Sequence, residues 1–544
     1  MRRSGVFVSM DMGSSMIKAA LVHVGREGPR FLSTGFAPLY RFGATDADAL
    51  EEAMSLDVRR TGAASVIGGA GVEAPLAVSS SMHGPLKVLV LGWKRAVAER
   101  MAARAISGSG GVISCSIWAD SCQRDRRGER VEERILRDPP DCVLCVGAAS
   151  ARGDFNPGWF VGFVEMAPSA PVLYCGELGG LGFLEGSFGR GRVRRLLNEG
   201  VPGDDGDALM FGDILSELHT RRSREALASY RGRFPGPERS NRVTRFVSVN
   251  AAVDCALQSL VEHGLDRAIY VDVGSSATIM GERLPSGSRL TVAGGVGTGH
   301  GITGALERIP EERRDARLLD WAANRRSRPW IIPESPYELE SERLILEACL
   351  DGVADLHGTG ARVPHPAKGM LVLAGVLGRS IIRWAGAEGS EGGLSARGGL
   401  ADNISILDRV KPAGAVRLAV DPANSLMHLG ALRACFGACP VLGADIPGLV
   451  SLGTLLTPVE EGGGGPGIRG GACLGIEMER AGSISVERGA VAGISLPAGE
   501  TAIARVSPAS GVDVGEGAGR PADIAVVGGI LGFVVDARGI SNDT

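Results

Sequence analysis

The chain has 544 residues, 44% of them hydrophobic and 22% charged, which is enough apolar material for two or three packed domains. Its formal net charge of -4 leaves no basic surplus for neutralising a phosphate backbone, so we expect no nucleic-acid partner. Asp11 interrupts the first apolar run and no apolar stretch reaches the roughly 20 residues of a membrane span, so we expect a cytoplasmic protein without a membrane partner.

The first predicted element is a strand at 6–10 that leads into the sequence D-x-G-S-S, starting at Asp11, and is followed by apolar residues. This pattern predicts a β-hairpin whose Gly-Ser-Ser turn faces a ligand. The same pattern returns in the middle of the chain, where a strand at 268–271 leads into D-x-G-S-S, starting at Asp272. One copy alone is equally typical of an ordinary turn, but two copies in two halves indicate a duplicated fold.

Between the two hairpins, apolar runs predict strands at 86–91 and 142–146 and helices at 96–105 and 251–263. Cys142 and Cys145 lie inside the second of these strands, which favours core packing over a metal or redox pair. His300, flanked by glycines, is a candidate for approaching a phosphate, although a turn histidine is an equally good interpretation.

Beyond the second hairpin, the pattern predicts a strand at 416–421 ending in Asp421, then a helix at 424–435 for which Asp421 is a candidate N-cap. Residues 460–471 are glycine-rich and predict a flexible connection, after which alternating apolar residues predict strands. We therefore expect a first lobe at 1–239, a second lobe at 240–450, and a linker with a β-rich C-terminal region at 451–544.

The residue types of the hairpins fit a phosphate site. A carboxylate at a strand end can hold Mg²⁺ through water, and glycine lets backbone amides approach phosphate oxygens. Asp11 and Asp272 are therefore the candidate catalytic residues, and Asp11 is the candidate metal ligand. The candidate nucleotide-binding residues of the two hairpins are Gly13, Ser14, Ser15, Lys18, Gly274, Ser275, Ser276 and Thr278.

These hairpins, with a glycine-rich adenosine segment at 372–378 that contains Gly375 and Val376, resemble the actin-like ATPase superfamily. Within it the chain is most similar to the MutL/GlmL proteins associated with adenosylcobalamin-dependent glutamate mutase. The segments that carry this resemblance are 11–18, 79–86, 140–147, 171–176, 294–300, 407–414, 418–421, 512–517 and 528–539. The resemblance implies an α/β, two-lobed, duplicated ribonuclease-H-like fold with a small β-rich C-terminal appendage, binding ATP or ADP with Mg²⁺.

The second hairpin departs from the family pattern, because Ser275 replaces a glycine and the closing acid is lost near Ile279. Three functions therefore stay open. The resemblance implies a reactivating chaperone, with weak ATPase activity at most, whose partners are the subunits of an adenosylcobalamin-dependent mutase. The alternatives are a small-molecule kinase acting on a sugar or acid, and a nucleotide-binding scaffold that does not hydrolyse ATP.

Overall fold

The computed structural model describes residues 5–25, 28–38, 74–80, 86–92, 102, 111–118, 131–147, 158–175, 178–196, 214–215, 217–222, 225, 243–357, 365–387, 404–437, 446–460, 472–479 and 482–538. Apart from residues 102 and 460, the helix predicted at 96–105 and the linker predicted at 460–471 lie outside these ranges. None of the described helices is long and apolar enough to cross a membrane.

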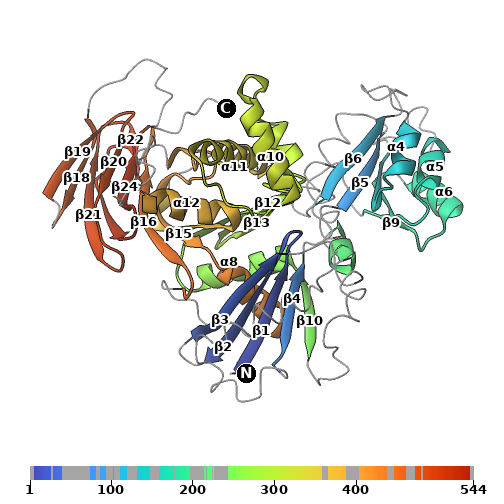
Figure 1. Ribbon diagram of the computed structural model, residues 1–544, viewed down its shortest axis with the longest axis horizontal. Coiled ribbons are helices and arrows are strands. Elements are labelled where there is room, and N and C mark those ends of the chain that lie inside the picture. The colour runs from blue at the N-terminus through green and yellow to red at the C-terminus, as the bar shows by residue number, and fades with distance from the viewer. Residues whose placement is uncertain are drawn as a thin grey trace.

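The N-terminal part of the chain forms a five-stranded mixed sheet in the order β10-β4-β1-β2-β3 (Figure 1). Strand β2 runs antiparallel to both of its neighbours, β1 and β3, whereas β4 runs parallel to both β1 and β10. The strand bounds are β1 Gly5–Met12, β2 Met16–Gly25, β3 Gly28–Pro38, β4 Leu76–Ser80 and β10 Thr244–Ser248. The first predicted hairpin is therefore the pair β1–β2.

A second sheet repeats this arrangement in the order β13-β12-β11-β14-β15, with the same strand directions, and then continues through β16, β24 and β20. Its strands are β11 Arg267–Val273, β12 Ala277–Leu284, β13 Gly287–Gly294, β14 His365–Ala374, β15 Gly414–Asp421, β16 Val450–Thr457, β20 Val491–Ile494 and β24 Gly532–Asp536. Two sheets with one topology, each led by one of the predicted hairpins, give the chain its two-lobed actin-like fold. The predicted fold class is confirmed.

Helices cover both faces of the second sheet, which explains the continuous apolar run of its central strand β11. Ile269 and Val271 pack toward α11 and α12, whereas Ala268 and Tyr270 pack toward α8 and α14. The described helices of this part are α8 Val249–Glu262, α9 Ile302–Leu306, α10 Ala316–Ser327, α11 Pro336–His357, α12 Gly375–Ala387 and α14 Ser425–Phe436, with a 3-10 turn at Glu311–Arg313.

Residues between β4 and β10 form a third sheet, which lies beside the two lobes in Figure 1. Its five strands all run parallel in the order β6-β5-β7-β8-β9. The elements of this insertion are β5 Leu86–Gly92, β6 Gly111–Trp118, α4 Val131–Arg137, β7 Cys142–Val146, α5 Gly158–Glu165, β8 Val172–Cys175, α6 Leu178–Phe188 and β9 Val193–Arg195. Cys142 and Cys145 are fully buried in β7, and burial raises the pKa of both thiols.

The domain boundaries differ from those predicted. The first lobe extends past residue 239, because β10 pairs with β4. The predicted strands at 86–91 and 142–146 belong to the insertion rather than to the first-lobe sheet. The C-terminal region is likewise not a separate unit from residue 451, because β16, β24 and β20 extend the second-lobe sheet.

The rest of the C-terminal region forms a four-stranded antiparallel sheet in the order β19-β18-β21-β23. Its apolar face packs against the second-lobe sheet, where Ile476 and Val506 share a buried cluster with Leu456 and Phe533. The strands are β18 Ala472–Met478, β19 Gly482–Glu487, β21 Thr501–Pro508 and β23 Ala522–Val527, beside a short pair of β17 Val459–Glu460 and β22 Val512–Asp513.

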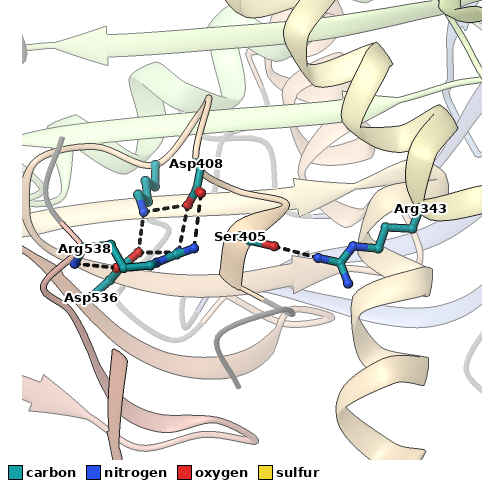
Figure 2. Close-up of polar contacts among 6 residues, drawn as sticks. Arg343, Ser405, Asp408, Asp536 and Arg538 are labelled. Atoms are coloured by element: carbon teal, nitrogen blue, oxygen red, sulfur yellow. Dashed lines mark hydrogen bonds and ion pairs between the residues drawn. The ribbon is translucent and has the colours of Figure 1, made fainter. Parts of the chain in front are cut away.

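A charged cluster fastens the end of β24 to the segment before β15 (Figure 2). Asp536 is fully buried and is bound by Lys411 and by Arg538, whose Nη2 lies 2.8 Å from Asp536 Oδ2. Asp408 accepts from both cations, at 2.7 Å from Lys411 Nζ and 2.9 Å from Arg538 Nη2. Burial alone would raise the pKa of Asp536. The hydrogen bonds and charges of Arg538 and Lys411 outweigh burial and hold the pKa of Asp536 below its usual range.

Helices α8 and α14 connect the two lobes. Helix α8 runs from the last strand of the first sheet to the first strand of the second, and α14 packs against both α8 and β1. A Cβ atom at Gly430 of α14 would clash with the carbonyl oxygen of Ala252 in α8. Only glycine therefore allows the two helix backbones to pack this closely.

Gly430→Ala is expected to lower the free energy of unfolding by at least about 2 kcal/mol, because the backbones of α8 and α14 must separate. Gly186→Ala in α6 is the matched control, since its Cβ would meet no atom within 4 Å and alanine favours a helix by about 1 kcal/mol. Urea unfolding measures both variants. Equal stability of the two variants would show that the close packing at Gly430 is not required.

Glu282 on β12 forms a second internal ion cluster. Arg267 Nη2 lies 2.6 Å from Glu282 Oε1, and His357 Nε2 lies 3.5 Å from Glu282 Oε2, while Thr291 Oγ1 lies 2.8 Å from His357 Nδ1. The hydrogen bond from His357, together with the hydrogen bond and charge of Arg267, lowers the pKa of Glu282 to about 2 against the opposing effect of burial.

A carboxylate whose pKa is lower in the folded than in the unfolded state stabilises the fold above its unfolded pKa, and this stabilisation is lost as the pH falls. The wild type should therefore lose about 1 kcal/mol more unfolding free energy than Glu282→Gln between pH 5.5 and pH 3.5. Urea titrations at the two pH values measure this difference. Glu347→Gln, which removes a part-exposed ion pair on α11, is the control and should show the same pH dependence of stability as the wild type. If Glu282→Gln also shows the wild-type pH dependence, the lowered pKa of Glu282 is contradicted.

Candidate functional site

The first hairpin ends in a tight turn at residues 13–15, closed by a hydrogen bond from Gly13 N to Met16 O of 2.9 Å. Asp11 stands opposite Lys18 in the strand register, with Lys18 Nζ 3.6 Å from Asp11 Oδ2. Ser79 on β4 donates to Asp11 Oδ1 at 3.1 Å, and Asn424 donates to Asp11 Oδ2 at 3.1 Å. The Asp11 carboxylate is therefore held in place by groups from both lobes.

The second hairpin repeats this turn at residues 274–276, where Gly274 N donates to Ala277 O at 3.0 Å. Asp272 corresponds to Asp11, but its cross-strand partner is Ile279 rather than a lysine. Asp272 Oδ1 accordingly has no hydrogen-bond partner among the described residues, and burial raises the pKa of this carboxyl group. The second turn therefore has a buried, unpartnered carboxylate oxygen beside it.

A glycine-rich loop at 294–301 encloses the second turn. Thr298 N donates to Gly274 O, and Gly299 N and Gly301 N both donate to Ser275 O, at 2.8 to 3.0 Å. A Cβ atom at Gly299 or Gly301 would overlap with atoms of Ser275 or Ser276. This loop therefore fixes the second turn, which gives a structural reason for the glycines in that segment.

The tips of the two hairpins meet. Ser276 Oγ donates to Ser14 Oγ at 2.6 Å, and His300 Nδ1 lies 3.4 Å from Ser15 Oγ and 3.5 Å from Ser275 Oγ. A cavity of about 130 Å³ lies between the hairpins. The predicted residues that line this cavity are Asp11, Gly13, Ser14, Ser15, Lys18, Asp272, Gly274, Ser275, Ser276, Gly375 and Val376.

Thr278 is the one predicted binding residue that does not line this cavity. Its side chain is fully buried, and its hydroxyl donates to Val296 O at 2.9 Å. Successive residues of a strand point to opposite faces, and Thr278 faces the core beside α11 rather than the hairpin tips. Thr278 therefore lies apart from the other predicted binding residues.

A second cavity of about 360 Å³ adjoins the first and lies between β3 of the first lobe and α12 of the second. The residues that line both cavities are Met16, Lys18, Pro329, Val376 and Arg379. The second cavity is also lined by Thr34, Gly35, Phe36, Arg325, Trp330, Ile331, Ile332, Pro333, Glu342, Ser380, Arg383, Pro422 and Ala423. Together the two adjoining cavities form a groove between the lobes.

Gly375 lines the first cavity directly after the end of β14. Its φ of 66° lies in the left-handed region that favours glycine, and a Cβ atom there would clash with Asp272 Oδ1. The predicted adenosine segment thus lies directly beside the second hairpin.

The sequence pattern gave no indication of several residues at this site. Ser248 and Asn250 at the start of α8, His219, Met427 and Arg379 all line the first cavity. Asn424 reaches Asp11 from the second lobe and has a left-handed backbone with φ of 60°. An Asn in the segment between the strand end at Asp421 and the helix was the one available signal, since asparagine tolerates this conformation.

The donor set fits Mg²⁺ bound through water. The carboxylates of Asp11 and Asp272 line one cavity, and Asp272 Oδ1 is unpartnered. The described residues contain no cluster of three or more His, Cys, Asp or Glu that could hold a metal ion directly. A small cation that keeps most of its water, as Mg²⁺ does, suits two carboxylates better than a fully dehydrated ion does.

Asp421 binds the start of α14 with its side chain, although the N-cap residue of this helix is Asn424 rather than Asp421. Its carboxylate accepts from Ser425 N at 2.7 Å and from Leu426 N at 2.8 Å, which satisfies free amides in the first turn of α14. Burial raises the pKa of Asp421 to about 6, against the effect of these hydrogen bonds and of Lys18.

The sequence matches no protein-family model and no curated protein. Solved structures match it at low similarity, and three examples differ in the share of the chain that they cover. Xylulose kinase from Bifidobacterium adolescentis is 10% identical over 82% of this chain and 96% of that chain, with a TM-score of 0.26. Nucleotide-free acetone carboxylase is 11% identical over 89% and 81%, with a TM-score of 0.32.

The third example, nucleotide-free diol dehydratase-reactivating factor, is 12% identical over 54% of this chain and 72% of that chain, with a TM-score of 0.20. These similarities are too low to carry an argument about function. The fold assignment rests instead on the duplicated strand order of the two lobes.

Proposed function

We propose that this chain binds ATP or ADP with Mg²⁺ between its lobes and acts as a reactivating chaperone for an adenosylcobalamin-dependent mutase of the glutamate mutase type. One observation carries the nucleotide part of this proposal: the equivalent turns at 13–15 and 274–276 meet at one cavity. Two glycine-serine turns that converge in this way offer backbone amides and hydroxyls to one polyphosphate from opposite sides.

Each end of the groove suits a different part of a nucleotide. The first cavity holds the ammonium group of Lys18 and the two turns, which suit the phosphates. The second cavity is larger and is lined by Phe36, Trp330 and Val376, which suit the nucleoside. Mg²⁺ bound near Asp11 and Asp272 would offset the charge of the phosphates.

Direct contacts between the lobes give a bound nucleotide a means of changing their arrangement. The hydrogen bonds from Ser276 to Ser14 and from Asn424 to Asp11 join the lobes at the ligand site itself. A nucleotide that replaces or strengthens these contacts favours one arrangement of the lobes over another. The α8–α14 pair is the connection about which such a movement would take place.

The mutase partner is proposed from the motif resemblance to MutL/GlmL proteins.

A chaperone function is favoured over a kinase function by the acids of the groove. Among the described residues that line the two cavities, the carboxylates are Asp11, Asp272 and Glu342. Glu342 is bound by Arg325 and Trp321, and Asp11 by groups of both lobes. Asp272, which we assign to the Mg²⁺ site, is then the one acid left, so the described lining residues include no further carboxylate to act as a general base for a substrate hydroxyl.

The test combines the full chain with glutamate mutase that carries an inactivated cobalamin, in the presence of ATP and Mg²⁺, of a non-hydrolysable ATP analogue, or of no nucleotide. We expect ATP binding to the chain and nucleotide-dependent release of the cobalamin, followed by absorbance after gel filtration. Phosphoryl transfer to a sugar or small acid without any effect on the mutase would support a kinase instead. Tight ATP binding without hydrolysis or release would support a scaffold.

A further inference from the structure

Two arginines of α12 face the second cavity, and the charge of Arg379 also interacts with that of Asp272 in the first cavity. Arg379 and Arg383 both line it, and neither has a hydrogen-bond or ion-pair partner among the described residues. They are four residues apart on one helix, so their side chains lie on the same face, about 6 Å apart along the axis. The side chain of Arg379 is exposed, and that of Arg383 is half-buried.

Among the residues that the structure describes, this cavity holds no free carboxylate to balance Arg383. Glu342 is its one carboxylate, and Arg325 Nη2 lies 3.0 Å from Glu342 Oε1, while Trp321 donates to Glu342 Oε2 at 2.9 Å. Glu342 therefore neutralises Arg325 and is not free for Arg379 or Arg383. Lys18, at the junction of the two cavities, pairs with Asp11 of the first cavity.

The positions of the two arginines along the groove differ. Arg379 lines both cavities and can reach a polyphosphate chain, whereas Arg383 lines only the second cavity, one helical turn further from the hairpin tips. Phe36 and Ile332, which are 72% and 58% exposed, line the same cavity from the two lobes and offer apolar surface to a flat group. A neutral ribose would leave the charge of Arg383 unmatched.

We propose that the second cavity binds a second anionic group, so that the preferred ligand is a nucleotide phosphorylated on its ribose as well as at the 5′ position. This inference rests on the proposed nucleotide function. A phosphate monoester on the 2′ or 3′ oxygen accepts hydrogen bonds from planar guanidinium groups, and such charge-assisted bonds are among the stronger ones in proteins.

Isothermal titration calorimetry on the full chain with AMP, adenosine 2′,5′-bisphosphate, adenosine 3′,5′-bisphosphate and ADP tests the inference. We expect one of the bisphosphates to bind at least about tenfold more tightly than AMP. Arg383→Gln should reduce this advantage to about threefold or less while leaving the affinities for AMP and ADP within about twofold. Arg326→Gln, an exposed arginine on α10, is the matched control and should change none of the affinities.

The outcomes separate the two proposals. If ADP binds but neither bisphosphate binds more tightly than AMP, the second anionic group is excluded while the nucleotide function stands. If Arg383→Gln weakens ADP and the bisphosphates equally, Arg383 contacts the 5′ phosphates and the inference is overturned. If no adenine nucleotide binds, ATP included, the proposed function fails together with the inference.

Discussion

Replacing Asp11 by asparagine is expected to weaken the binding of ATP in the presence of Mg²⁺ by roughly ten- to a hundredfold. The carboxylate lies at the end of β1 in the wall of the hairpin cavity, where Ser79 and Asn424 fix its two oxygens. Asparagine keeps the shape of the side chain but removes the charge that attracts the hydrated cation. Equilibrium titrations with ATP in Mg²⁺ measure the loss.

A second titration of the same variant in EDTA separates a metal role from a general disturbance of the site. Without the cation, the carboxylate repels the phosphates, so Asp11→Asn should then bind ATP as tightly as the wild type or more tightly. Asp523→Asn, which changes an exposed acid of the C-terminal sheet, is the control and should follow the wild type in both buffers. If Asp11→Asn loses the same ATP affinity in Mg²⁺ and in EDTA, Asp11 does not act by binding the metal ion.

Replacing Lys411 by methionine is expected to lower the free energy of unfolding by about 3 kcal/mol. Lys411 and Asp536 are both buried and form an ion pair at the point where β24 joins the second lobe. Figure 2 shows the charged groups of Asp408, Asp536 and Arg538 converging at this point. Removing one cation leaves Arg538 to balance two carboxylates.

Arg505→Met supplies the comparison for this prediction. Arg505 pairs with Asp523 on the outer face of the C-terminal sheet, where both side chains are more than half exposed. An exposed pair of this kind contributes about 1 kcal/mol or less. Urea unfolding of the two variants should therefore give clearly different stabilities, and a similar small loss in both would mean that the Lys411 cluster is not needed to hold β24.

The repeated D-x-G-S-S pattern was sufficient to predict the duplicated fold, because each copy combines a buried strand with the same run of turn-favouring residues. The helices predicted at 251–263 and 424–435 are confirmed as α8 and α14, and the strand at 416–421 is confirmed as part of β15. In the two helices, the local apolar period and a side chain that binds the first-turn amides, Ser248 or Asp421, define the element.

Pairings between distant segments were not predictable from the sequence. The strands β5 and β7 have the apolar runs of any buried parallel strand, so nothing local shows that they form a sheet of their own. The same holds for β24, whose partners β16 and β20 are distant along the chain. Asn424 and Arg379 were missed for a similar reason, because their roles depend on which segment lies opposite them.

The central claim is that the two hairpin tips close on the same polyphosphate, and the rate of disulfide formation between cysteines at 14 and 276 tests it most directly. Ser14 Oγ and Ser276 Oγ lie 2.6 Å apart, so the double variant Ser14→Cys with Ser276→Cys should cross-link under mild oxidation, whereas each single variant should not. ATP with Mg²⁺ should slow this cross-linking severalfold, because phosphates bound between the turns separate the two thiols. Cross-linking at the same rate with and without the nucleotide would contradict the account.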